Sequence, residues 1–336
     1  MNINLDNQVL AVLDTVETLA EIGELELLER LKPFCDRTIG DDGALVNIAP
    51  DCRLVVTTDV LADDVHFSDR TTLPHAIGWR STAANLSDLA AMGATPLGIT
   101  IGLGLPAQTT WPWIQQLYRG IADCLAQYGG TILGGDVYRA NQRTVSITAL
   151  GQVRPEHAIF RHTAKPGMTV ITTGRHGFSR AGLDILLASK DIITDRQKSW
   201  VEKHQYPLPR LDAIAHLQSI RPYPTTTGMD SSDGLANALL QISQRSGVGI
   251  EIEQSHLDIS EDLIAFVGEE KALEWTLYGG EDFELVLCLP SVNADRFLSV
   301  CKGAIAIGRT TRSGSVQLRL PNGSTQTIEH QGFQHF

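Results

Sequence analysis

Acidic residues recur along this chain beside glycine, serine and threonine, and few of them have a basic neighbour in sequence. Asp230 and Asp233 are the clearest pair, since they bracket two serines and precede a glycine and an apolar run. Most of the acids in the motifs GDDGALV, TTDV, ADDVHF, NLSDLAAMG, LGGDV and YGGEDFELVL have similar neighbours. Carboxylate and hydroxyl oxygens are the ligands that Mg²⁺ prefers, and glycine lets backbone N–H groups approach phosphate oxygens. The pattern therefore predicts a site that binds several Mg²⁺ ions and phosphate groups.

Helix capping is the alternative explanation for any one of these acids. Aspartate and serine are favoured at helix N-caps, and an acid suits the positive end of the helix dipole. Capping does not explain why so many acids share one context. Two carboxylates about 4 Å apart would also repel by ~4 kcal/mol at an effective dielectric of about 20 unless a cation lay between them. Asp88 makes the strongest case for a bound cation, because a carboxylate among the apolar residues of LSDLAAMGA is costly to bury unpaired.

Strands and helices alternate around the first group of acids. Apolar and β-branched runs predict strands at residues 53–61, 97–106, 131–137 and 144–153. Helical periodicity predicts helices at residues 23–34, 74–94 and 109–130. This β-α-β-α-β-β order predicts an α+β domain over residues 1–153, and the residues before Gly23 are expected to be a loosely attached extension.

A second domain is expected over residues 154–336, again with helices against a sheet. Its predicted strands are residues 168–174, 247–253, 279–290 and 304–310, and its predicted helices are residues 178–189, 207–220 and 292–302, with another helix after MDSSDGL. The length of 336 residues suits two domains, and the 43% hydrophobic content is enough for a sizeable core.

The formal net charge of −12 bears on the kind of partner. No basic stripe is present to release counterions, so a nucleic-acid partner is not expected. An anionic substrate would be repelled unless a metal or a local basic group intervened. Motifs of familiar nucleotide enzymes are absent, including G-x-x-x-x-G-K-[ST], G-x-G-x-x-G and the protein-kinase set. A nucleotide enzyme with this sequence must therefore use an unusual fold.

The cysteines and the N-terminal residues bear on the cellular compartment. Five scattered cysteines without a C-x-x-C pair make a disulfide framework and a zinc site unexpected. The start, MNINLDNQVL, lacks the basic and apolar regions of a signal peptide, and no run approaches about 18 apolar residues. We expect a soluble cytoplasmic protein without a membrane partner.

Seven motifs in this order resemble those of the thiamine-monophosphate kinases, a family within the aminoimidazole ribonucleotide synthetase superfamily of ATP-binding α+β proteins. They are GDDGALV, TTDVLADDVHF, NLSDLAAMGATP, GGDVYR, MDSSDGL, GGEDFEL and the closing GFQHF, and the similarity runs from about Gly23 to Phe336. The resemblance implies that the N-terminal mixed sheets of two chains pair into one barrel, giving a homodimer. It also implies that a C-terminal α/β sandwich-like domain completes the active site.

The resemblance further implies a reaction and the residues that support it. The γ-phosphoryl group of ATP would pass in line to thiamine monophosphate, bridged by Mg²⁺, to give thiamine diphosphate without a protein nucleophile or base. The implied metal ligands are Asp42, Thr57, Thr58, Asp59, Asp88, Asp136, Asp230 and Asp233. The implied ATP contacts are Tyr118, Gly135, Asp136, Arg161 and Ser232. The implied contacts to thiamine monophosphate are His66, Glu281 and Phe333.

Two positions depart from the family pattern, and two other functions remain open. Ser231 stands where an apolar residue is common, and Phe333 stands where family members often have tyrosine or tryptophan. One alternative is another ATP-dependent enzyme of the superfamily, of the aminoimidazole ribonucleotide or selenophosphate synthetase type. The latter needs a reactive cysteine in a glycine-rich loop, a setting that Cys35 lacks. The other alternative is a non-catalytic nucleotide or metal sensor.

Overall fold

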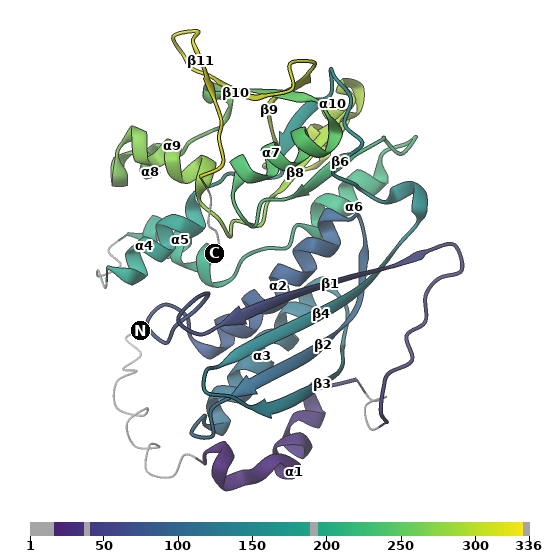
Figure 1. Cartoon of the computed structure of the whole chain (residues 1–336), viewed down its shortest axis with the longest axis vertical. Helices are drawn as coiled ribbons and strands as arrows, with labels where there is room; N and C mark the ends of the chain where they lie inside the picture. Colours follow the sequence, from purple (N-terminus) through teal and green to yellow (C-terminus); the bar gives the residue numbers. More distant parts are fainter. Residues whose placement is uncertain (1–16, 37–40, 189–193, 332–336) are drawn as a thin grey trace. The chain divides into compact units, whose positions relative to one another are not determined.

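The computed structural model describes residues 17–36, 41–188 and 194–331 (Figure 1). The chain forms two compact units, neither of which is a continuous segment. Unit 1 consists of Met1–Val46, Thr58–Thr82 and Gly98–Thr148, and unit 2 consists of Asn47–Thr57, Ala83–Leu97 and Ala149–Phe336.

The first half of the chain contains helices and a four-stranded sheet in the predicted order. Its elements are α1 (Leu19–Leu31), the short 3₁₀ helix η2 (Lys32–Phe34), β1 (Arg53–Ala62), α2 (Pro74–Ala91), β2 (Thr95–Leu105), α3 (Trp111–Tyr128), β3 (Ile132–Arg139) and β4 (Thr144–Val153). The strand order in the sheet is β1-β4-β2-β3, and β2 pairs with β3 in parallel. The predicted α+β class is confirmed by this mixture of sheet and helices.

The N-terminal boundary of the first helix differs from the prediction. Helix α1 begins at Leu19, so the expectation of a loose extension up to Gly23 is wrong for its last turn. A capping box stabilises this start, because Glu21 Oε2 accepts hydrogen bonds from the backbone N–H of Thr18 at 2.7 Å and from its hydroxyl at 2.8 Å. Gly23 has a φ of 73°, which kinks the helix at the residue where the prediction began.

The two faces of the four-stranded sheet differ in exposure. Along β4, every second residue from Val145 to Val153 is buried, and the residues between them are half-buried. Along β1, three apolar side chains on one face are exposed, with exposed fractions of 44% for Leu54, 56% for Val56 and 50% for Val60. Alternation of this kind indicates a sheet that packs on helices with one face and leaves the other open.

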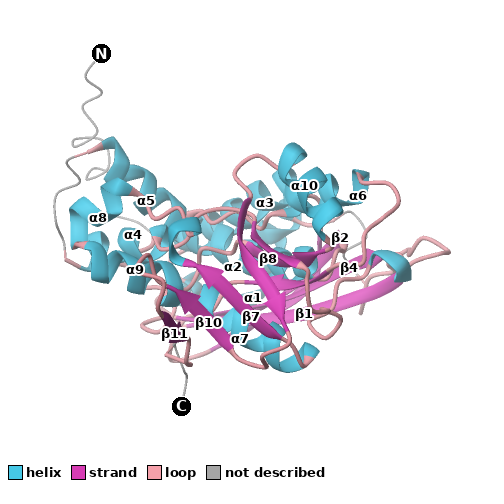
Figure 2. Cartoon of the chain, turned by 90° about the horizontal axis from the view of Figure 1, so that it is seen from above, coloured by secondary structure: helices cyan, strands magenta, loops and turns pink. Residues whose placement is uncertain are grey.

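The second half of the chain is built around a seven-stranded mixed sheet (Figure 2). Its strands are β5 (Thr169–Thr172), β6 (Thr227–Asp230), β7 (Gly249–Glu253), β8 (Leu285–Leu289), β9 (Ile305–Thr311), β10 (Val316–Arg319) and β11 (Thr325–Thr327). Their order is β11-β10-β7-β9-β5-β8-β6. Its helices are α4 (Phe178–Leu187), α5 (Asp195–Gln205), α6 (Leu211–Ser219), α7 (Leu235–Ser246), α8 (Glu261–Val267), α9 (Glu269–Tyr278) and α10 (Ser291–Val300), with short 3₁₀ helices η3 (Pro155–His157) and η4 (Gln254–His256).

Both faces of this larger sheet are covered. Val170 of β5 packs in one buried cluster with the apolar residues of α7, whereas the next residue, Ile171, packs in another cluster with α6 and α10. Val286 and Leu287 of β8 divide in the same way. Because successive strand residues point to opposite faces, this division places α7 on one face and α6 with α10 on the other.

Four helices form a separate apolar cluster in unit 2. Figure 2 shows α4, α5, α8 and α9 gathered together, and their buried core includes Phe178, Trp200 and Trp275. Helix α5 was not predicted, because the sequence DRQKSWVEKHQ is largely polar. Its start is set by a capping box between Thr194 and Gln197.

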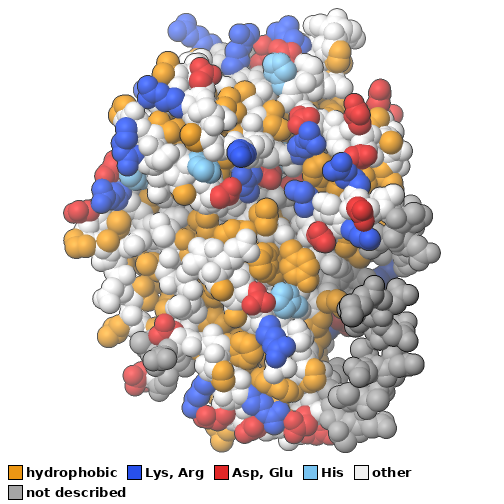
Figure 3. Space-filling model, turned by 180° about the vertical axis from the view of Figure 1, so that it is seen from behind, with side chains coloured by type: hydrophobic (Ala, Val, Ile, Leu, Met, Phe, Trp, Pro, Cys, Tyr) orange, Lys and Arg blue, Asp and Glu red, His pale blue; other side chains and the backbone are white. Residues whose placement is uncertain are grey.

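The surface carries charges of both signs. On the face shown in Figure 3, acidic and basic side chains are interspersed among apolar and neutral ones. Within the described ranges, no helix combines the length and the apolar character needed to cross a membrane.

Candidate active site

Asp230 lies at the carboxyl end of β6, where the chain leaves the seven-stranded sheet. Its side chain is only 2% exposed. The hydroxyl of Ser87 donates to Asp230 Oδ2 at 2.9 Å, and the hydroxyl of Ser232 donates to Oδ1 at 3.2 Å. Ser87 comes from α2, so this carboxylate joins two of the sequence motifs, NLSDLAAMG and MDSSDGL.

Asp88 follows Ser87 on α2 and faces the same neighbourhood. The hydroxyl of Thr57 donates a short hydrogen bond to Asp88 Oδ2. Burial raises the pKa of Asp88 and the negative charge of Asp233 raises it further, while the Thr57 hydrogen bond and the positive charge of Arg161 oppose the change. A carboxylate in this environment gains stability when a cation binds to it.

Asp233 stands just before α7 but does not cap it. The N-cap residue is Gly234, and no side chain caps the helix start. Asp233 Oδ2 instead accepts a hydrogen bond from Asn237 Nδ2 at 3.2 Å. The capping explanation for Asp230 and Asp233 is therefore wrong for this helix.

Arg161 and Ser232, two of the predicted ATP contacts, belong to the same unit as these three carboxylates. The Arg161 side chain is exposed, and its Nη1 donates to Gln241 Oε1 of α7 at 2.7 Å. The positive charge of Arg161 lowers the pKa of Asp88 and so opposes the effect of burial. Unit 2 thus brings a guanidinium and a serine hydroxyl to a group of acidic oxygens.

The GGEDFEL motif forms a turn before β8, so the prediction of one strand over residues 279–290 is wrong for its first half. Strand β8 begins only at Leu285. Glu281 and Phe283 have φ values of 65° and 53°, and this left-handed backbone cannot continue a strand. The turn is tied to MDSSDGL by the N–H of Glu281, which donates to Ser232 O at 2.7 Å.

Asp282, inside that turn, caps helix α4. One carboxylate oxygen accepts the N–H of Gly177 at 2.6 Å, and the other accepts the N–H of Ser179 at 2.8 Å. Burial raises the pKa of Asp282 to about 7, although these two backbone hydrogen bonds lower it. The GGEDFEL sequence pattern alone did not predict this role of Asp282.

Glu284 anchors the end of the turn in a buried network. Its side chain accepts a short hydrogen bond from Arg210 Nη1 and another from the hydroxyl of Thr173 at 2.6 Å. Arg210 Nη1 also donates to the backbone oxygen of Thr173 at 2.5 Å. The sequence did not indicate this role of Arg210, because Glu284 and Thr173 lie 74 and 37 positions away from it along the chain.

Ser231, one of the two departures from the family pattern, forms two buried hydrogen bonds. Its hydroxyl donates to Glu284 O at 2.9 Å and hydrogen-bonds the buried Nε2 of His176 at 2.9 Å. Burial lowers the pKa of His176 to about 4, so the ring is neutral at pH 7. Ser231 and His176 thus form a buried polar contact.

The predicted site residues of unit 1 lie on or beside its strands. Thr58 and Asp59 are on β1, and the Thr58 hydroxyl lies 2.8 Å from that of Thr148. Gly135 and Asp136 are exposed on β3. A Cβ atom at Gly135 would lie 2.2 Å from Ile101 O, so glycine is required there for β2 and β3 to pair.

His66, Tyr118 and Asp42 are the remaining predicted residues of unit 1. His66 Nδ1 accepts the N–H of Ala62 at 3.1 Å, which leaves the proton of a neutral ring on Nε2. Tyr118 is only 4% exposed, and its ring packs on Phe34 with the ring centroids 5.7 Å apart. Asp42 is exposed.

One acid of the ADDVHF motif proves to have a basic partner. Asp63 pairs with Arg143 at 2.6 Å, and the same guanidinium pairs with Asp69 at 2.7 Å. Proximity in sequence did not reveal this pairing, because Asp63 and Arg143 are 80 positions apart.

The eight predicted metal ligands divide equally between the units, with Asp42, Thr58, Asp59 and Asp136 in unit 1 and Thr57, Asp88, Asp230 and Asp233 in unit 2. Phe333, a predicted substrate contact, lies outside the described residues. Among the residues that the structure describes, no three His, Cys, Asp or Glu side chains form a preformed metal site. Mg²⁺ is commonly bound through one or two carboxylates together with substrate phosphates and water, so the oxygen atoms present suit that ion.

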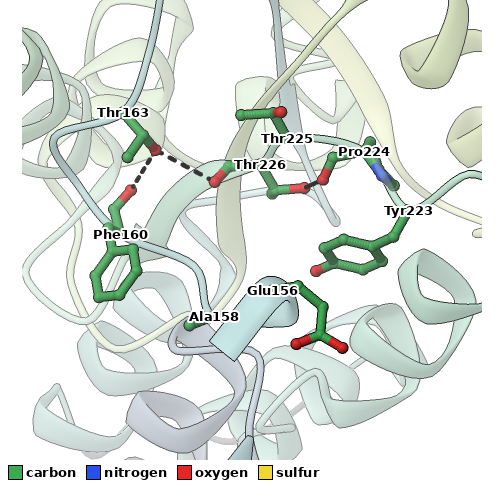
Figure 4. Close-up of a pocket in the computed structure, with 8 residues that line it drawn as sticks. All are labelled: Glu156, Ala158, Phe160, Thr163, Tyr223, Pro224, Thr225 and Thr226. Carbon is green, nitrogen blue, oxygen red and sulfur yellow. Dashed lines mark hydrogen bonds between the residues drawn. The ribbon is translucent and has the colours of Figure 1, made fainter. Parts of the chain in front are cut away.

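A surface hollow of about 170 Å³ lies elsewhere in unit 2, between residues 156–163 and 223–226 (Figure 4). The hydroxyls of Thr163, Thr226 and Tyr223 are already hydrogen-bonded to protein atoms at 2.6, 3.0 and 3.1 Å. No predicted site residue lines the hollow, so we do not assign it to the site.

Comparison with known proteins identifies the relatives of this chain. Residues 40–153 match the AIR synthase related protein, N-terminal domain, and residues 165–321 match the C-terminal domain of that family. A thiamine-monophosphate kinase of Synechococcus elongatus is 44% identical over 324 residues, which cover 95% of this chain and 98% of that protein.

Solved structures of thiamine-monophosphate kinases are also similar to this chain. The thiamine-monophosphate kinase of Stenotrophomonas maltophilia K279a aligns with a TM-score of 0.78 and 30% identity, over 87% of this chain and 95% of that one. A structure described as AaThiL complexed with AMPPCP and TMP aligns with a TM-score of 0.77 and 30% identity, over 96% of this chain and 100% of that one. The similarity extends over nearly the whole of each chain compared.

Proposed function

Because this chain belongs to the thiamine-monophosphate kinases of the AIR synthase related family, we propose that it transfers a phosphoryl group from ATP to thiamine monophosphate through bridging Mg²⁺ ions. Phosphorylation of thiamine monophosphate with ATP is the activity of the family. The bridging by Mg²⁺, the residues that perform it, and the homodimer are the parts that we propose here. We further propose residues 1–153 and 154–336 as the two domains, and the cytoplasm as the location.

The observation that carries the metal proposal is the oxygen-only chemistry around Asp88. Thr57, Asp88, Asp230 and Asp233 offer carboxylate and hydroxyl oxygens, which suit Mg²⁺ and not a softer metal. The raised pKa of Asp88 also means that the surrounding protein does not fully stabilise its ionised carboxylate. The other residues that we propose as Mg²⁺ ligands are Asp42, Thr58, Asp59 and Asp136 of unit 1.

The reaction needs no general base from this chain. The acceptor is an oxygen of a phosphate monoester, whose second pKa is about 6, so it is ionised at neutral pH. When bound, Mg²⁺ neutralises negative charge on the donor and acceptor phosphates. The side chains then need only bind and orient the reactants.

We propose separate roles for individual residues in binding and orienting the reactants. Arg161 and Ser232 would contact ATP phosphate oxygens. The hydrogen bond from Ser232 to Asp230 and the effect of the Arg161 charge on Asp88 support this role. His66 offers an Nε2–H group as a hydrogen-bond donor to thiamine monophosphate. Glu281 offers a carboxylate to the positively charged end of that substrate.

We also propose that two copies of the chain pair through the open face of the four-stranded sheet. Leu54, Val56 and Val60 give that face exposed apolar side chains on an edge strand. Exposed apolar patches on a sheet face are commonly covered by another protein surface. Closure of two sheets into one barrel would cover them and would give a two-fold symmetric dimer.

The decisive experiment is to incubate purified protein with ATP, Mg²⁺ and thiamine monophosphate and to measure thiamine diphosphate by chromatography. We expect formation of thiamine diphosphate and ADP that stops when EDTA is added. No turnover with any phosphate acceptor, despite ATP binding, would favour a nucleotide sensor. Turnover with a different acceptor would favour another enzyme of the superfamily.

A further inference from the structure

A buried histidine of α5 lies against the residue expected to bind the substrate. His204 is 2% exposed, and its Nδ1 lies 3.0 Å from the hydroxyl of Ser179 and 3.8 Å from Glu281 Oε2. The Glu281 side chain is 35% exposed. One side of this carboxylate therefore faces a buried ring, while another part of it is open to a ligand.

The backbone on either side of the Glu281 side chain is firmly held. Glu281 itself has a left-handed φ of 65°, and its N–H donates to Ser232 O at 2.7 Å. The next residue, Asp282, accepts hydrogen bonds from the backbone of Gly177 and Ser179. With the backbone held, the direction of the Glu281 carboxylate depends on its side-chain torsions and on the groups that it touches.

The His204 ring is held as firmly as that backbone. A Cβ atom at Gly182 would lie 2.2 Å from Trp200 O and 3.0 Å from His204 Cβ, so α4 and α5 are packed in direct contact. Ser179 connects the two parts, because its N–H binds Asp282 and its hydroxyl binds His204. The ring thus presents a fixed surface to Glu281.

We propose that His204 is a positioning residue that holds the Glu281 carboxylate in the direction needed to meet thiamine monophosphate. This inference rests on the proposed function and deepens it. The substrate carries a permanent positive charge on its thiazolium ring and an amino group on its pyrimidine ring, and a carboxylate is the natural partner of both. His204 acts through Glu281, since its buried ring does not face solvent.

The first test is the kinetics of His204→Ala. We expect KM for thiamine monophosphate to rise about tenfold, because a misdirected Glu281 carboxylate makes a weaker contact with the positively charged substrate. We expect kcat to change less than about twofold and KM for ATP to stay unchanged, because the phosphate contacts are elsewhere. The exposed His256 supplies a matched control, and His256→Ala should behave as wild type.

Rescue and coupling separate positioning from a general structural role. His204→Asn keeps a polar atom near the place of Nδ1 and should recover much of the lost affinity. In a Glu281→Ala background, His204→Ala should raise KM no further, because its effect passes through the missing carboxylate. Independent, multiplicative effects of the two changes would overturn the proposal.

The outcomes also separate this inference from the proposed function. If wild type forms no thiamine diphosphate, both fail together. If wild type is active and His204→Ala has the wild-type KM, the inference alone is overturned. If His204→Ala does not fold, as judged by circular dichroism, His204→Asn and Ser179→Ala decide the matter. Ser179→Ala should then raise KM for thiamine monophosphate, and a wild-type KM in that variant would overturn the proposal.

Discussion

The hydroxyl of Thr57 donates a hydrogen bond to the carboxylate of Asp88, which links strand β1 to helix α2 across 31 positions of sequence. The two residues come from different acid motifs, and both are predicted metal ligands. Burial raises the pKa of Asp88, so this pair marks a place where an added cation would be stabilised.

Replacement of Asp88 by asparagine should lower kcat by about 100-fold or more. Loss of the charge weakens Mg²⁺ binding and leaves phosphate repulsion uncompensated in the transition state. Excess Mg²⁺ should partly restore activity, because mass action refills a weakened site. Asp59→Asn should behave similarly, whereas Asp295→Asn, an exposed change on α10, should not. Steady-state kinetics across a Mg²⁺ titration provides the measurement.

Replacement of His66 by alanine should raise KM for thiamine monophosphate about tenfold with a much smaller change in kcat. The change would remove the hydrogen-bond donor that we propose for the substrate, and the proposed reaction needs no general base. Excess Mg²⁺ should not restore the affinity. If His66→Ala abolished kcat while the aspartate variants stayed near wild type, His66 would have to be the base.

Mg²⁺ and ATP together should raise the melting temperature more than ATP with EDTA. A ligand that binds only the folded state at about 100 times its dissociation constant adds ~2.7 kcal/mol to the free energy of unfolding. Differential scanning fluorimetry with each addition alone and in combination measures the shift. Equal shifts with and without the metal would count against acids that bind Mg²⁺.

The pH dependence of stability should flatten in Asp282→Asn. Burial raises the pKa of Asp282 from 3.8 to about 7, so between these values the folded state keeps a proton that the unfolded state loses. The stabilising contribution of Asp282 is therefore full below about pH 4 and is lost as the pH rises through about 7.

Urea unfolding at several pH values between about 4.5 and 8 tests this. The wild-type free energy of unfolding should carry a downward contribution with rising pH that Asp282→Asn lacks. Asp295→Asn should keep the wild-type dependence. Parallel curves for wild type and Asp282→Asn would show that Asp282 ionises normally in the folded protein.

A lysine at Val56 should prevent dimer formation. Val56 is 56% exposed on the open face of β1, and a buried charge there would be costly in a barrel. Light scattering should give twice the chain mass of 36.6 kDa for wild type and the chain mass for Val56→Lys. Val292→Lys, at a 67% exposed position on α10, should remain dimeric. A monomeric wild type at micromolar concentration would refute the pairing.

Local patterns predicted much of the fold. The strands and helices between residues 53 and 153 follow the expected order, because each is a single run with a period near 2 or 3.6 residues. Helix α5 was not predicted, because few of its residues are buried. Trp200 and His204 are two of these buried residues. The turn at residues 279–284 was not predicted, because contacts with neighbouring segments, and not the local sequence pattern, hold Glu281 and Phe283 in left-handed conformations.

The residue types alone reveal the acid motifs, their order and their resemblance to one kinase family. They do so because binding of phosphates and Mg²⁺ depends on the chemistry of particular side chains. What each acid touches is decided by folding. Asp282 and Glu284 stand in one motif, yet the first caps α4 and the second binds Arg210, 74 positions away. Such partners depend on how separate strands and helices pack, and a local periodicity carries no information about distant neighbours.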